Sequence, residues 1–158
     1  MQTEVLFYRA RGGWRDAAIR CLTGSLYSHC ELVAPGQAGP IVKTIGASMR
    51  DGWRVRRARI DTGSGSWDVL RFRGDPEEAW SRAVALDGAP YDAVGALFSA
   101  SLLNRRRPGR WFCSELVGHA LGWREPWRFS PGMLAAASEE EGPCSTALQP
   151  GLPRMSGC

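Results

Sequence analysis

The sequence predicts a single α+β domain, and three observations lead to this fold class. Segments with strand patterns and segments with helix signals both occur, they do not alternate strictly along the chain, and 19 Gly and 10 Pro imply many turns. A length of 158 residues suits one domain with a substantial core. We expect the domain to span residues 1–140, followed by a Pro/Gly/Ser-rich tail, 141–158, that is loosely packed or disordered.

Strand patterns fall mainly in the first half of the chain. Residues 3–9 read as a strand, and residues 26–34 and 41–49 flank a Pro/Gly-rich loop, which predicts a hairpin-like pair. A turn at residue 51 opens a segment of alternating pattern that runs to residue 60, and residues 67–73 form a further strand after the turn "GSGS".

Helix signals mark five segments. A short helix is predicted over residues 14–22, ended by Gly24. Asp75 and Pro76 suit the N-cap and the first position of a helix over 75–88. The remaining predicted helices cover 91–103, 112–122 and, with Ser130 as the cap, 130–141.

Composition restricts the function classes. The net charge of +4 and the Arg runs "WRVRRARI" and "NRRRPGRW" permit nucleic-acid binding, but such runs are usually solvated faces and neither lies in a known nucleic-acid motif. Five cysteines without CxxC spacing and only two histidines argue against a zinc site, and we expect no cofactor. The N-terminus has no apolar signal core and no window approaches the ~18 apolar residues of a membrane span, so a reduced cytoplasmic protein is expected.

Cys113 allows two interpretations. Apolar residues at 113, 116, 117, 120 and 121 form the stripe of an amphipathic helix, and on this pattern Cys113 is a buried core thiol. Its place in the first turn, however, puts the thiol at unpaired backbone N–H groups and the positive end of the helix dipole, and the preceding "RRRPGR" adds positive charge. These features lower a thiol pKa and favour a nucleophile.

A nucleophilic cysteine needs a base close in space. His119 lies six residues along the same helix and projects to the polar face with Glu115, so we interpret it as a solvated residue. In a strand, His29 shares a face with Glu31, while Cys30 points to the other face. His29 is therefore the better candidate base.

The order of these motifs resembles a known family. "YSHCELV" (27–33), followed some eighty residues later by "WFCSELVGHALG" (111–122), is similar to the circularly permuted papain-like hydrolases of the NlpC superfamily, including their lecithin retinol acyltransferase-like branch. "YDAVGALF" (91–98) and "FSPGML" (129–134) also resemble segments of such proteins, many of them small and from phages and bacteria. The resemblance covers roughly residues 3–140 and implies a permuted papain-like fold, with an antiparallel sheet packed against helices that include the Cys helix.

The resemblance implies that Cys113 is the nucleophile and His29 the general base. The family's third polar residue, often a Glu in a "Glu-Ala" stretch on the next strand, corresponds here to Gly46 of "TIGASM". Thr44 or Ser48 could replace it, depending on register. Glu31 is a weaker candidate, because it lies two residues along the same strand as His29. A catalytic dyad of Cys113 and His29 without a third residue is the remaining alternative.

The expected function is a cysteine peptidase or amidase that acts on peptide or peptidoglycan amide bonds through a thioacyl-enzyme. The resemblance also allows the lipid acyl or thioester substrates of the lecithin retinol acyltransferase-like branch, because nothing in the chain selects between these and amide substrates. Two alternatives remain: a catalytically inactive family member that acts as an interaction module, and a basic nucleic-acid-binding protein. The sequence leaves the oligomeric state open.

Overall fold

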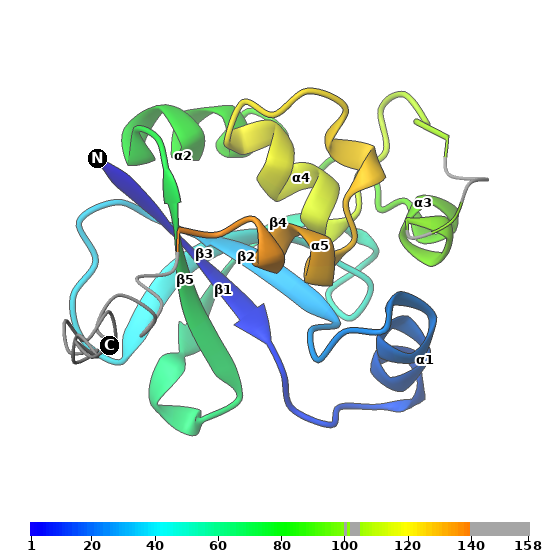
Figure 1. The fold of residues 1–158 in the computed structure, drawn as a ribbon. Helices are drawn as coiled ribbons and strands as arrows, with labels where there is room; N and C mark the ends of the chain where they lie inside the picture. The colour runs from blue at the N-terminus through cyan, green and yellow to red at the C-terminus, as the bar shows by residue number, and fades with distance from the viewer. Residues whose placement is uncertain (100, 102–104, 140–158) are drawn as a thin grey trace, which may run out of the picture.

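A computed structural model describes residues 1–99, 101 and 105–139 as a mixed α+β fold (Figure 1). Its five-stranded antiparallel sheet has the order β4-β3-β2-β1-β5, with the strands β1 (Gln2–Tyr8), β2 (His29–Val33), β3 (Ile41–Ser48), β4 (Arg54–Asp61) and β5 (Trp67–Arg73). The α+β class predicted from the sequence is confirmed. The predicted tail, 141–158, lies outside the described residues, and with it Cys144 and Cys158.

Strand pairing follows one prediction and adds one feature that the sequence does not reveal. β2 and β3 form the expected antiparallel pair, with Leu32 opposite Ile45. β5 returns to the opposite edge of the sheet and pairs with β1 along its whole length rather than with β4. β2 starts at His29, three residues later than predicted, because residues 26–28 form the turn out of the first helix.

The helices are α1 (Trp14–Thr23), α2 (Pro76–Val84), α3 (Ala93–Phe98), α4 (Cys113–Ala120) and α5 (Pro131–Ala136), with 3-10 turns at Thr62–Ser64 and Pro126–Arg128. The expected caps are present: Asp75 accepts from the N–H groups of α2, Ser130 accepts from Met133, and Gly24 ends α1 with a left-handed φ of 61°. α3 begins only after its cap, Asp92, and ends at Phe98, whereas residues 100 and 102–103 of the predicted helix lie outside the described residues. None of the helices within the described ranges is long and apolar enough to cross a membrane.

The main core lies between the sheet and the helices α2, α4 and α5 (Figure 1). Phe7, Leu32 and Ile45 from the sheet meet Leu116 and Val117 of α4, all of them buried. A smaller cluster on the other side of the sheet contains Leu6, Val33 and Val42, with Ile60 and Trp67 packed against it. Alternation along β2 therefore directs Cys30 and Leu32 toward α4, and Glu31 and Val33 toward the opposite side.

Candidate active site

Cys113 is the first residue of α4 and is 4% exposed. Phe112 before it is extended (φ −107°, ψ 171°), and its carbonyl accepts the first helical hydrogen bond from Leu116 at 3.0 Å. The N-cap has no side-chain hydrogen bond to the helix. The position of Cys113 thus agrees with both interpretations of the sequence. Cys113 belongs to the buried stripe of the helix, and it also lies at the positive end of the helix dipole.

His29, the first residue of β2, lies within hydrogen-bonding reach of the Cys113 thiol. Its Nε2 atom is 3.0 Å from Oε1 of Glu31, and its ring meets Trp67 edge-on. Burial alone lowers the pKa of His29, but the hydrogen bonds and charges of Cys113 and Glu31 outweigh burial and raise it to about 10. The imidazole is therefore held as an imidazolium at neutral pH.

The pKa of the Cys113 thiol lies well below its usual range. The hydrogen bond with the Cys30 side chain is the largest cause, burial opposes it, and the hydrogen bond and charge of His29 lower the pKa further. Together with the protonated His29, these interactions favour a thiolate–imidazolium pair, which is the reactive form of a cysteine nucleophile.

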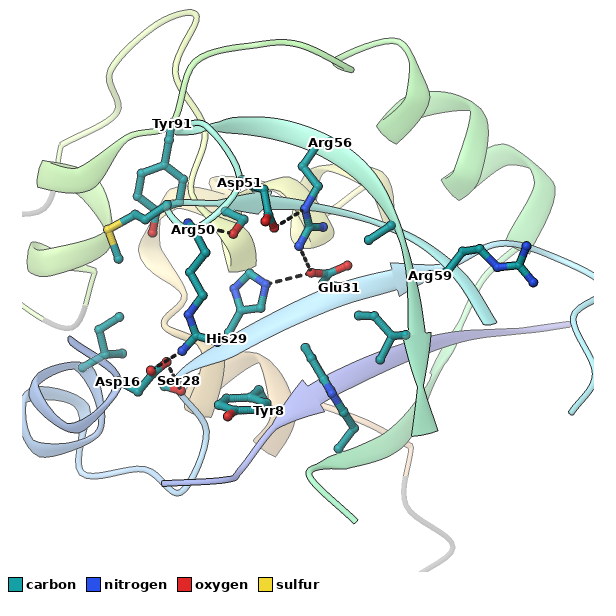
Figure 2. A pocket seen from close by; sticks show the side chains of 17 residues that line it. Tyr8, Asp16, Ser28, His29, Glu31, Arg50, Asp51, Arg56, Arg59 and Tyr91 are labelled. Carbon is teal, nitrogen blue, oxygen red and sulfur yellow. Dashed lines mark hydrogen bonds and ion pairs between the residues drawn. The ribbon is translucent and has the colours of Figure 1, made fainter. Parts of the chain in front are cut away.

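Glu31 is the second residue that contacts the His29 side chain. The Glu31 side chain is 1% exposed, and its carboxylate accepts from Oγ1 of Thr44 at 2.5 Å and from a terminal nitrogen of Arg56 at 2.7 Å. Arg56 also donates to Asp51 at 2.8 Å (Figure 2). Burial raises the pKa of Glu31, but His29 and Arg56 lower it to about 2, so the carboxylate remains charged.

Gly46 provides the space for this carboxylate. A Cβ atom at residue 46 would lie 2.7 Å from Cγ and 2.9 Å from Cδ of Glu31. The register explains the contact: Leu32 faces Ile45, so Glu31 comes opposite Gly46, and Gly46 in turn pairs with Arg56 on β4. The glycine that stands where the resemblance implies a third polar residue thus faces a carboxylate from the neighbouring strand.

The three candidates for the third residue separate clearly. Glu31, the weaker candidate on sequence grounds, is the one that contacts His29, because its side chain extends back along the strand. Thr44 contacts Glu31 instead and so positions the carboxylate. Ser48 is buried, and its hydroxyl accepts from the backbone N–H of Arg50 at 3.1 Å.

A cavity of about 350 Å³ opens beside His29 (Figure 2). Its lining includes Tyr8, Asp16, Arg50, Trp67 and Tyr91. Arg50 forms an ion pair with Asp16, whose carboxylate also accepts from the hydroxyl of Ser28. Tyr91 is buried, and its pKa is raised by burial and by the charge of Cys113. Cys113 therefore interacts with two residues of the cavity wall, His29 and Tyr91.

Sequence reasoning missed several residues at this site: Arg56, Asp51, Tyr91 and Cys30. The sequence contained part of the signal for Arg56, because residues 55–60 show the alternating pattern of a strand. The structure adds that Arg56 pairs directly with Gly46. Tyr91 reaches the site through a bridge to Trp111, two residues before Cys113, which no local pattern predicts.

His119 was expected on a solvated polar face with Glu115, and this expectation is wrong for Glu115. Glu115 is 2% exposed and accepts from the backbone N–H of Phe112, and burial raises its pKa to about 7. His119 is half-buried, with its ring 4.9 Å from that of Trp111. It is not the partner of Cys113, whose imidazole contact comes from His29.

No set of three or more His, Cys, Asp or Glu side chains in the described part of the chain is arranged to hold a metal ion. Comparison with protein-family models gave no match, and comparisons with curated proteins and with solved structures gave no significant match.

Proposed function

We propose that this protein is a cysteine hydrolase with a permuted papain-like fold that cleaves amide bonds in peptides or peptidoglycan. One observation carries the proposal: Cys113 begins a helix within reach of His29, and Glu31 contacts Nε2 of the same imidazole. Nucleophile, base and orienting group occur in the order that acyl-transfer chemistry needs. The motif order noted in the sequence supports the same assignment.

In the proposed reaction, the Cys113 thiolate attacks the carbonyl carbon of the amide. The backbone N–H of Cys113, free at the start of α4, donates to the oxyanion that forms. The His29 imidazolium then gives its proton to the departing amine, the C–N bond breaks, and a thioester to Cys113 remains. His29, now neutral, takes a proton from water, which attacks the thioester and releases the carboxylic acid and the thiolate.

Glu31 is a positioning residue in this scheme. Its hydrogen bond to Nε2 fixes the ring so that the other nitrogen serves Cys113, and its charge stabilises the imidazolium. Thr44 and Arg56 keep the carboxylate in place. The Tyr91 hydroxyl, whose raised pKa keeps it protonated, is available in the cavity as a hydrogen-bond donor to the substrate.

Ion pairs weaken the case for nucleic-acid binding. Arg56 and Arg57 of the first Arg run pair with Glu31 and Asp87, and Arg107 of the second run pairs with Asp92. These carboxylates compensate part of the positive charge that phosphates would need.

Alkylation kinetics test the proposal. Iodoacetamide, followed by mass spectrometry of individual peptides, should modify Cys113 faster at pH 6.5 than the exposed Cys21, although Cys113 is buried. His29→Ala should remove that advantage while leaving the rate at Cys21 unchanged. Equal rates at Cys113 and Cys21 in the unaltered protein would contradict the proposal.

Substrate assays then address the reaction. We expect release of new amino groups from peptide or muropeptide pools with the unaltered protein and none with Cys113→Ser. A reactive Cys113 with no hydrolysis of either pool would direct the search to ester and thioester acyl substrates.

A further inference from the structure

A second thiol lies against the candidate nucleophile. Cys30 is fully buried in β2, next to His29 in the chain, and its side chain interacts with that of Cys113. Both residues belong to the same core cluster, where α4 lies against β2, and both are free thiols. The proposed hydrolysis does not use Cys30.

The two thiols differ in protonation. Burial and the charge of Cys113 raise the pKa of Cys30 well above its usual range, whereas the pKa of Cys113 is lowered. A thiolate reacts with peroxides far more readily than a thiol does, so Cys113 is the oxidisable member of the pair. A neighbouring thiol is the group that normally captures the oxidised product.

We propose that Cys30 is a resolving cysteine, which forms a reversible disulfide with Cys113 when a peroxide oxidises the nucleophile. The Cys113 thiolate attacks one peroxide oxygen, the O–O bond breaks, and a sulfenic acid and hydroxide (or alkoxide) form. The Cys30 sulfur then attacks the Cys113 sulfur, the S–O bond breaks, and the proton of Cys30 leaves with the hydroxyl group as water. The peroxide is reduced, and two thiols become one disulfide.

The packing favours this pairing over others. β1 fixes Cys30 through its pairing with Phe7, and α4, which begins at Cys113, packs against β2, so both cysteines lie in elements that are in direct contact. Cys21, by contrast, is exposed on α1 and does not belong to the core cluster.

Two consequences follow for the site. The disulfide removes the nucleophile, so the hydrolase would be inactive under peroxide stress and active again after reduction. It also protects Cys113 from the irreversible sulfinic acid. The loss of hydrolysis rests on the proposed function, whereas the disulfide itself does not.

The test uses the full chain with Cys21→Ser, Cys144→Ser and Cys158→Ser, so that only Cys30 and Cys113 remain. After treatment with hydrogen peroxide and blocking with N-ethylmaleimide, a non-reducing tryptic digest should contain the peptide 21–43 joined to the peptide 111–124. Dithiothreitol should separate the two peptides and restore rapid alkylation of Cys113.

The matched variant adds Cys30→Ala to this background. Here we expect Cys113 to progress to sulfinic acid, with less than a tenth of its alkylation recovered by dithiothreitol. If Cys30→Ala does not fold, trapping of the sulfenic acid with dimedone in the three-serine protein gives the same information. Little of the stable dimedone adduct should form there, because Cys30 captures the short-lived sulfenic acid first.

The outcomes separate the two proposals. Sulfinic acid at Cys113 without any joined peptide, in the protein that retains Cys30, would overturn the resolving role and leave the hydrolase intact. A joined peptide in a protein that hydrolyses no substrate would support the redox pair and count against the hydrolase.

Discussion

The carboxylate of Glu31 occupies the space that a side chain at Gly46 would need, with Cγ of Glu31 only 2.7 Å from the position of a Cβ on residue 46. The two residues face each other across β2 and β3. The absence of a side chain at Gly46 of β3 therefore leaves room for the charged carboxylate of Glu31 on β2, which lies beside His29. Because the contact is steric, it can be tested by substitution on either strand.

Gly46→Ala should displace Glu31. The added methyl group clashes with buried atoms that Thr44 and Arg56 hold in place, so we expect a loss of roughly 1–3 kcal/mol in the free energy of unfolding. Urea denaturation measures this loss. Gly13→Ala is the matched control, since a Cβ there meets nothing within 4 Å. The double variant Glu31→Ala/Gly46→Ala should be more stable than the sum of the single effects predicts, and strict additivity would refute the steric contact.

Exchange of the two residues should preserve part of the site. Glu31→Gly with Gly46→Glu moves the carboxylate to β3, where the Cβ of residue 46 starts 3.3 Å from the present position of Oε1. Arg56 still pairs with residue 46 and can hold the new carboxylate. We expect alkylation of Cys113 at pH 6.5 to be faster in the double variant than in Glu31→Gly alone. Equal rates would mean that the carboxylate is effective only from β2.

The sequence predicts the fold class well because the signals for it are local. Period-two alternation and turn residues locate the strands, and Asp75, Ser130 and Gly24 locate helix ends. The pairing of β5 with β1 has no such signal, because it is decided by the packing of both strands on the shared core.

For the site, the sequence identifies Cys113 and His29 from position and order, but it undervalues Glu31. Spacing along a strand measures the separation of Cα atoms, while a glutamate side chain can extend back toward its neighbour, as the 3.0 Å contact with His29 shows. Whether it does so depends on the empty place at Gly46, which is a property of the next strand. Cys30 escapes prediction for the same reason, because its partner lies on a helix eighty residues away in the chain.

Glu115 should make stability depend on pH. Its pKa in the folded protein, about 7, lies above the ordinary value of 4.5, so its stabilising contribution is complete below pH 4.5 and is lost as the pH rises through 7. Glu115→Gln keeps an acceptor for the Phe112 N–H but cannot ionise. We expect the variant to gain on the order of 2 kcal/mol over the unaltered protein between pH 5 and pH 8 in urea denaturation. Glu77→Gln, at an exposed site in the first turn of α2, should show no such gain, and a gain of the same size there would remove the argument from burial.

Glu31→Gln should shift the pH dependence of Cys113 alkylation. The substitution removes a charge that raises the pKa of His29, so that pKa falls from about 10, the imidazolium stabilises the thiolate less, and the pKa of Cys113 rises. The thiolate is then lost at a higher pH than in the unaltered protein. A shift of one pKa unit corresponds to about a tenfold slower alkylation at pH values below both the original and the raised pKa of Cys113.

Rates of iodoacetamide modification at Cys113 between pH 4 and pH 9 measure this shift. Glu4→Gln, which removes a partly exposed carboxylate paired with Arg71 on the edge strand, is the control and should leave the profile unchanged. Thr44→Val should produce a smaller shift in the same direction, because it removes one hydrogen bond to Glu31 and leaves the charge. It also provides a milder variant if Glu31→Gln fails to fold. An unshifted profile in both Glu31→Gln and Thr44→Val would mean that the Glu31 carboxylate has no effect on the pKa of Cys113. The site would then consist of Cys113 and His29 alone.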